Sequence, residues 1–140
     1  MHQTWTKSKR LRKSVEFQHV QRKGHKWSSK DFLFLFCMKK KKQKIDTIRV
    51  SNISLQWRFG FVVSKKVGNA VVRNTIKRLL RENVRIELAQ YSQQSSAVIK
   101  EIDVVIVAFT SACNIQFTDV QQQIQQAFSH ITKNMSRNTP

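Results

Sequence analysis

A run of basic residues with helical spacing stands in the middle of this sequence. Its polar members are Lys65, Lys66, Arg73, Asn74, Lys77, Arg78 and Arg81. Guanidinium groups form paired hydrogen bonds with phosphate oxygens, and ammonium groups add positive charge. Solvated helix faces usually mix both signs of charge, whereas no acid appears here before Glu82. The residue types therefore predict a surface that binds a polyanion through its phosphates.

Candidate general acids and bases are scattered along the chain. The histidines are His2, His19, His25 and His130. Two histidines around a phosphodiester could cleave it, but nothing in their spacing brings these four together. The 8 acidic residues form no pair with the pattern of a two-metal site, and no glycine-rich phosphate loop or nucleophile elbow is present. We predict a binding protein with no catalytic residues and no metal ligands of its own.

A strand followed by a helix must position the basic run. The apolar run at 59–63 predicts a strand over residues 58–64, and Asn69 is the expected N-cap of a helix that continues to about Ala89. One face of this helix is apolar and should lie on a sheet. That face comprises Val72, Ile76, Leu79, Leu80 and Asn83. The basic residues are expected on roughly the opposite side.

The composition restricts the class of partner. The 140 residues suffice for one domain, 1–140, and 26 Lys and Arg against 8 Asp and Glu give a net charge of +18. This excess indicates nucleic acid first and an anionic membrane surface second. No apolar window is long enough to span a membrane, and no secretory signal follows the basic N-terminus. Cys37 and Cys113 are expected to be buried free thiols, and a cytoplasmic location fits this pattern.

The remaining elements follow from periodicity. Residues 1–13 form a basic arm, and residues 14–23 predict a helix that ends at Gly24. Residues 31–38 predict a strand that is apolar on both faces, with Phe32, Phe34 and Phe36 on one side. Leu33, Leu35 and Cys37 should lie on the other side, which needs a second cover or a ligand.

The second half of the chain completes an α+β sandwich with the order α-β-β(-β)-α-β-α. The expected segments are a charged loop at 39–44, edge strands at 47–50 and 53–57, a loop at 91–100, a central strand at 102–109, a helix at 117–133 and a frayed tail at 134–140. The glutamine-rich face of the last helix carries few charges and is interpreted as structural. Helices should cover the sheet mainly on one face.

Residues 64–82 resemble the signature segment of the protein subunit of bacterial ribonuclease P. The family pattern of Arg-Asn, then Lys-Arg, then a further Arg is present at Arg73–Asn74, Lys77–Arg78 and Arg81. Thr75 stands where the family usually has another basic residue. The resemblance implies a ribosomal-protein-like fold with a left-handed strand–helix–strand connection, although such connections are normally right-handed.

The resemblance also implies a cleft for the single-stranded 5′ leader of precursor tRNA. The matching positions are Phe17, Gln21, Leu33, Leu35 and Val62. Gln21 replaces an aromatic residue of the family, and Leu35 stands where Tyr is common. In this family the RNA subunit is the catalyst, Mg²⁺ is held mainly by RNA, and the protein binds both the catalytic RNA and precursor tRNA.

Three other classes of protein could carry this charge. A structural RNA-binding protein of ribosomal type has the same size and charge, and would bind RNA without taking part in cleavage. A DNA-binding protein is disfavoured because no second helix or dimerisation segment supports the basic helix. A membrane-surface protein is disfavoured because the face opposite the cations has the pattern of a packed core.

Overall fold

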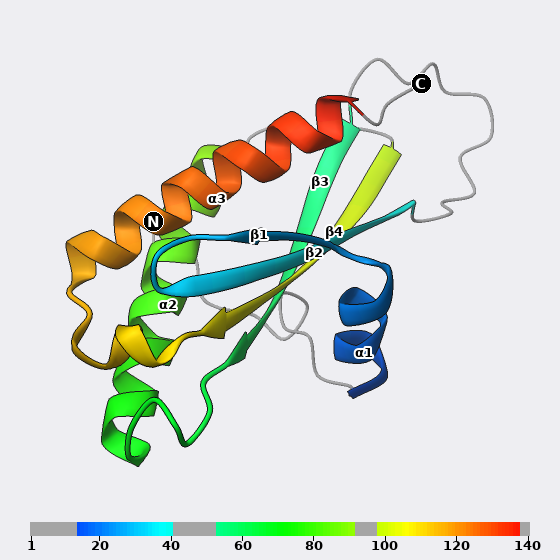
Figure 1. Cartoon of the computed structure of the whole chain (residues 1–140). Coiled ribbons are helices and arrows are strands. Elements are labelled where there is room, and N and C mark those ends of the chain that lie inside the picture. Colours follow the sequence, from blue (N-terminus) through cyan, green and yellow to red (C-terminus); the bar gives the residue numbers. More distant parts are fainter. Residues whose placement is uncertain (1–13, 41–52, 92–97, 138–140) are drawn as a thin grey trace.

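A mixed sheet of four strands lies at the centre of the computed structural model, which describes residues 14–40, 53–91 and 98–137 (Figure 1). The elements along the chain are α1 (Ser14–Lys23), β1 (His25–Ser28), β2 (Phe32–Lys40), β3 (Ile53–Val62), α2 (Ala70–Tyr91), β4 (Val98–Ala108), the 3-10 helix η2 (Thr110–Asn114) and α3 (Phe117–Arg137). The predicted α+β class and element order are confirmed.

The strand order is β1-β2-β4-β3, so β2 and β4 are central. β2 is antiparallel to both β1 and β4, whereas β3 is parallel to β4 and joined to it through α2. The register places Phe34 opposite Ile106 in β4 and Phe59 opposite Val104. Opposed residues share a face of the sheet, so these pairs assign every strand position to one of two sides.

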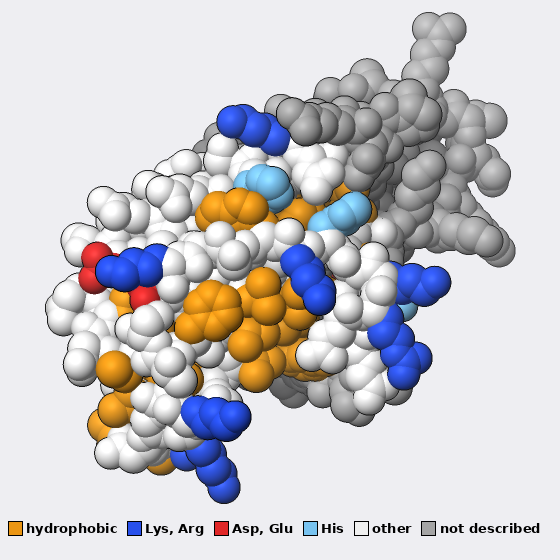
Figure 2. All heavy atoms as spheres, viewed as in Figure 1, with side chains coloured by type: hydrophobic (Ala, Val, Ile, Leu, Met, Phe, Trp, Pro, Cys, Tyr) orange, Lys and Arg blue, Asp and Glu red, His pale blue; other side chains and the backbone are white. Residues whose placement is uncertain are grey.

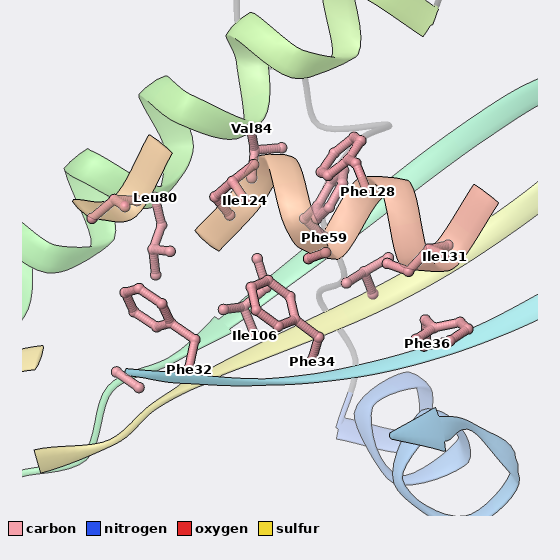
Figure 3. Packing of buried hydrophobic residues seen from close by; sticks show 14 of the residues in the cluster. Phe32, Phe34, Phe36, Phe59, Leu80, Val84, Ile106, Ile124, Phe128 and Ile131 are labelled. Atoms are coloured by element: carbon pink, nitrogen blue, oxygen red, sulfur yellow. The ribbon is translucent and has the colours of Figure 1, made fainter. Parts of the chain in front are cut away.

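One side of the sheet carries the main core beneath α2 and α3 (Figure 3). Phe32, Phe34 and Phe36 of β2 are each 1% exposed or less and point towards these helices. Each contributes about 1.5–3 kcal/mol by leaving water. Phe128 of α3 stacks on Trp57 with ring centroids 4.8 Å apart, which fixes α3 across the sheet.

Among the described helices, α1 alone covers the opposite side, which has a second, smaller apolar cluster. Val20 of α1 is fully buried against this cluster, which includes Leu35, Cys37 and Val105. The predicted alternation along β2 is therefore confirmed. α1 ends at Lys23, and a Cβ on the next residue, Gly24, would lie 2.3 Å from the carbonyl oxygen of Val20 and 2.9 Å from that of Phe36. Glycine is needed here for close approach of two backbones.

The structure corrects the expected strands. No strand is predicted at residues 25–28, yet β1 lies there and pairs with β2. Its four residues show no alternation of apolar side chains, so only the pairing with β2 makes them a strand. The segments expected at 53–57 and 58–64 form one continuous strand, β3, which ends at Val62. Lys39 and Lys40 belong to β2 rather than to a loop.

Several boundaries also differ from those predicted. α2 continues to Tyr91, β4 begins at Val98 and ends before Phe109, and α3 reaches Arg137 instead of ending at residue 133. The expected basic arm, the edge strand at 47–50 and the lysine run from residue 41 onwards lie outside the described residues. No helix among those described has the length and apolarity needed to cross a membrane.

Candidate nucleic-acid interface

The basic helix α2 begins with a side-chain cap, as predicted. Asn69 Oδ1 accepts a hydrogen bond from the backbone N–H of Val72 at 3.0 Å, and Asn69 O accepts from Arg73 N at 2.9 Å. A Cβ at Gly68 would lie 2.8 Å from Val72 Cβ, so the turn into the helix needs a residue without a side chain. The buried Val67 holds this turn against the core.

The predicted basic residues reach solvent to different extents. Five of the seven are exposed, namely Lys65, Lys66, Asn74, Arg78 and Arg81, whereas Arg73 and Lys77 are half-buried. The basic row Arg73, Lys77 and Arg81 was expected opposite the packed face of the helix. This is correct for Arg81 at the end of the row and wrong for Arg73 at its start. A row of residues spaced four apart drifts by about 40° per step around a helix of 3.6 residues per turn. The row therefore begins beside the packed face and turns outwards.

Arg73 is placed for a phosphate at the edge of this surface. Its Nε is buried and has no hydrogen-bond partner within residues 14–40, 53–91 and 98–137. An unpaired buried donor is unfavourable, and a charged acceptor would remove this penalty. None of the seven predicted residues forms a salt bridge with a described carboxylate, so their charge is available to a partner.

The second predicted surface is the part of the sheet that α1 leaves open. Phe17, Leu33 and Val62 are half-buried, and all three pack against the smaller apolar cluster. Gln21 is exposed on α1, whereas Leu35 is only 4% exposed because the side chains of α1 cover it. Figure 2 shows the hydrophobic patch between β2 and α1, with Lys and Arg side chains around it.

Two residues of this open surface were not predicted as part of it. Val107 is half-buried and lies opposite both Leu33 and Val62 in the sheet register. Alternation along the strand 102–109 was the signal that could have found it. Lys26 lies opposite Leu35 on the exposed edge of the sheet, and only the unpredicted strand β1 places this cation beside the patch.

A buried ion pair lies on the same side of the sheet. Arg58 Nε donates to Asp103 Oδ1 at 2.8 Å, and its terminal nitrogen donates to Oδ2 at 2.9 Å. The Asp103 side chain is fully buried, while that of Arg58 is 20% exposed. This bidentate pair links β3 to the parallel strand β4, and both carboxylate oxygens of Asp103 accept hydrogen bonds in it.

A basic helix and an open apolar patch on a chain of this charge fit RNA, and comparison with known proteins decides the family. The family model described as Ribonuclease P matches residues 5–132. The chain belongs to the ribonuclease P protein family. The Staphylococcus aureus (strain Mu3) ribonuclease P protein component is 32% identical over 127 residues, covering 91% of this chain and 90% of that protein.

Solved structures of ribonuclease P proteins share this fold. The Staphylococcus aureus RNase P protein structure has a TM-score of 0.63 and 29% identity, covering 89% of this chain and 96% of that one. The RNase P protein from Thermotoga maritima, at 23% identity, has a TM-score of 0.58 over 84% of this chain and 93% of that one. As a ribonuclease P protein, the chain is a subunit of a tRNA-processing endoribonuclease with an RNA partner.

The histidines require a correction. The sequence indicates that nothing brings them together, but His25 and His130 both contact the ring of Phe36, with centroids 5.5 and 6.1 Å away. His130 also stacks on Trp27 at 5.5 Å. These are ring contacts between the sheet edge and α3, away from the open patch of this ribonuclease P protein. They form no acid–base pair around a substrate groove.

The two cysteines differ in their exposure. Cys37 is a buried free thiol, as predicted, whereas Cys113 is free but exposed in η2, so its expected burial is wrong. The described residues contain no group of three or more His, Cys, Asp or Glu side chains that could hold a metal ion.

Proposed function

We propose that this ribonuclease P protein holds the catalytic RNA on α2 and the 5′ leader of precursor tRNA on the open patch of the sheet. The observation that carries this proposal is the unequal cover of the two sheet faces. Two long helices bury one face, whereas α1 leaves Leu33, Val62 and Val107 half-buried on the other. An apolar surface that remains open on a strongly basic chain suits an extended nucleic-acid strand.

The exposed cations of α2 support contact with the catalytic RNA. Arg78 and Arg81 reach solvent without acidic partners in the described structure, and Lys65 and Lys66 extend the surface before the helix. Each phosphate that such a group neutralises releases a counterion, so the affinity for RNA should fall steeply with salt. The buried Nε of Arg73 adds a directed donor at the edge of the surface.

The open patch supports contact with a single-stranded leader. The Phe17 ring and the aliphatic side chains can pack against unstacked bases, and such contacts tolerate many base sequences. Lys26 at the sheet edge is placed to meet a leader phosphate. The leader would thus be held with little sequence selectivity at this patch.

The catalytic centre belongs to the RNA subunit in this proposal, and Mg²⁺ is held mainly by that RNA. Metal ions of this kind supply an activated water and stabilise developing charge in phosphodiester hydrolysis. The contribution of the chain is to neutralise phosphates through α2 and to fix the leader on the sheet. Both effects increase substrate affinity and lower the Mg²⁺ concentration that the ribonucleoprotein needs.

Reconstitution with a bacterial ribonuclease P RNA tests the proposal. Cleavage of precursor tRNA with a long leader and with a leader of a single nucleotide is measured at limiting Mg²⁺ for the unmodified protein and four variants. Arg73→Ala and Arg78→Ala should weaken cleavage of both substrates. Leu33→Ala should weaken cleavage only when the leader is long. Lys133→Ala removes one exposed cation from α3 and serves as the matched charge control.

The outcomes separate the two surfaces. Activity of Arg73→Ala and Arg78→Ala equal to that of the Lys133→Ala control would exclude α2 as the RNA surface. A Leu33→Ala effect that is the same for both substrates would exclude the patch as the leader site. Such a result would match a structural RNA-binding role without contact to the leader.

A further inference from the structure

A row of aromatic rings lies along the β1 edge of the sheet and is not used by the proposed function. Trp27 of β1 stacks on His130 of α3, with ring centroids 5.5 Å apart and planes inclined by 22°. His130 meets the buried ring of Phe36 edge-on at 6.1 Å, and His25 of β1 lies tilted against the same ring at 5.5 Å. These four residues are the ring row. Trp27 and His130 are half-buried and His25 is exposed, so part of the row is open to solvent.

The register of the sheet connects the open patch with this edge. Val62, Val107 and Leu33 lie opposite one another across β3, β4 and β2. The same line continues to Ser28 of β1, which is exposed. Ser28 comes directly after Trp27, whose side chain lies on the other face because successive side chains of a strand alternate. A nucleic-acid strand laid along this line therefore leaves the sheet at Ser28, beside Trp27.

The direction of the leader along this line follows from the place proposed for the catalytic RNA. The basic helix α2 comes directly after β3 in the chain, so the cleavage site belongs near β3. In the strand order, β1 is three strands away from β3. Neighbouring strands are about 4.8 Å apart, so the line reaches β1 after about 14 Å. The leader nucleotides farther from the cleavage site would thus be the ones that arrive at the ring row.

The charge around the ring row suits a phosphodiester strand. Residues 17–30 and 120–137, which include β1 and most of α3, contain no Asp or Glu. Lys26 of β1 is exposed, and so is Lys133, one turn after His130 on α3. Figure 2 shows histidine and apolar side chains between α3 and β1, with a basic side chain beside them. A peptide would also suit exposed rings, but the net charge of +18 favours a polyanion.

We propose that the ring row stacks a base of the leader upstream of the nucleotides that lie on the open patch. The inference rests on the proposed function, because it extends the same leader over the edge of β1. Every base has a flat π surface, so stacking on Trp27 or His25 adds affinity without selecting a base. Lys26 lies on the patch side of the same edge and neutralises the phosphate that crosses it.

An abasic scan of the leader tests this contact. Precursor tRNAs with a long leader carry one abasic nucleotide at each leader position in turn, and their affinity for the reconstituted ribonucleoprotein is measured at constant salt. With the unmodified protein, one abasic nucleotide upstream of the patch should weaken binding about tenfold, the effect of one stacked base. With Trp27→Leu, which keeps an apolar side chain but has no flat ring, the same abasic nucleotide should have no effect. Trp27→Phe keeps a ring and should restore the loss.

Phe117→Leu is the matched control for the loss of an aromatic ring. Phe117 is 36% exposed on the same helix as His130, but it lies about 20 Å nearer the start of α3. The control should show the same abasic position and the same loss as the unmodified protein. The proposal is overturned if no upstream position responds, or if the response is equal in the unmodified protein and Trp27→Leu. Disappearance of the response in Phe117→Leu would overturn it as well.

Leader length separates this inference from the proposed function. A leader that ends on the open patch should bind more tightly than a leader of a single nucleotide, and equally well to the unmodified protein and to Trp27→Leu. If affinity does not depend on leader length in any of the proteins, the proposed leader site fails together with this inference. If the patch responds to length but Trp27→Leu behaves as the unmodified protein with every leader, only this inference fails.

A probe in the unmodified protein guards against misfolding of the variants. 2-Aminopurine at the responsive upstream position should lose fluorescence when the ribonucleoprotein binds, because stacking on an aromatic ring quenches this base. Unchanged fluorescence would overturn the proposal. A tenfold loss of affinity of Trp27→Leu for the catalytic RNA alone would assign the ring row to that RNA, and would also overturn the proposal.

Discussion

The contact between Phe17 and Gly60 gives a prediction that can be worked through from the structure. Gly60 lies in β3 beneath the ring of Phe17, and a Cβ built on it would be 2.4 Å from Phe17 Cε1 and 2.5 Å from Cζ. These distances are too short for real carbon atoms. Gly60→Ala must therefore displace the ring, which is the movable end of its side chain.

The magnitude follows from two opposed terms. Phe17 is half-buried, so displacing its ring loses about half of the roughly 1.5–3 kcal/mol for full burial, or about 1 kcal/mol. Alanine in place of glycine in a strand favours the folded state by about 0.5–1 kcal/mol. Gly60→Ala alone should then change the free energy of unfolding by only a few tenths of a kcal/mol.

A double-mutant cycle measures the energy that is lost when the ring of Phe17 is displaced. In a Phe17→Ala background the ring is absent, so Gly60→Ala should stabilise the protein by about 0.5–1 kcal/mol. The coupling energy between the two positions is expected to be about 1 kcal/mol. This coupling energy is measured by urea unfolding of the unmodified protein, the two single variants and the double variant, analysed with one common denaturant slope. A Gly60→Ala effect that is equal in both backgrounds would refute the packing of α1 described here.

Three further predictions test the ion pair, the helix cap and the basic surface. Asp103→Asn should lower the free energy of unfolding by about 2–3 kcal/mol, because the largely buried guanidinium of Arg58 then faces a neutral amide in place of a carboxylate; a loss below about 0.5 kcal/mol in urea unfolding would contradict this. Asn69→Ala should cost about 1 kcal/mol by leaving Val72 N–H without its cap, whereas Asn69→Ser should restore most of that stability in thermal unfolding. Arg78→Ala should reduce the slope of log affinity against log salt for ribonuclease P RNA by about 1, and an unchanged slope would show that this side chain meets no phosphate.

Periodicity within single segments predicted much of the fold. The apolar pattern of residues 31–38 predicted a strand that is apolar on both faces, and helical spacing from Val72 predicted the packed face of α2. The Asn69 cap also depends only on nearby backbone amides, so the sequence was enough to predict it. These features succeed because each depends on contacts within a few residues along the chain.

The boundaries of the candidate sites needed contacts between distant residues. Leu33 and Leu35 have equivalent places in the strand pattern, but the side chains of α1 cover only Leu35. The half-burial of Arg73 depends on its position beside the packed face of α2 and also on how α2 lies against the rest of the fold.

The amino-acid sequence by itself determined the charge, the basic helix, the apolar strands and the α+β class, since composition and local periodicity carry that information. The tertiary structure alone decided that β1 exists, which apolar side chains remain open, and that Asp31 meets Gln123 across 92 residues of chain. Those outcomes arise from packing between helices and strands, because the exposure of a side chain depends on which other element packs against it.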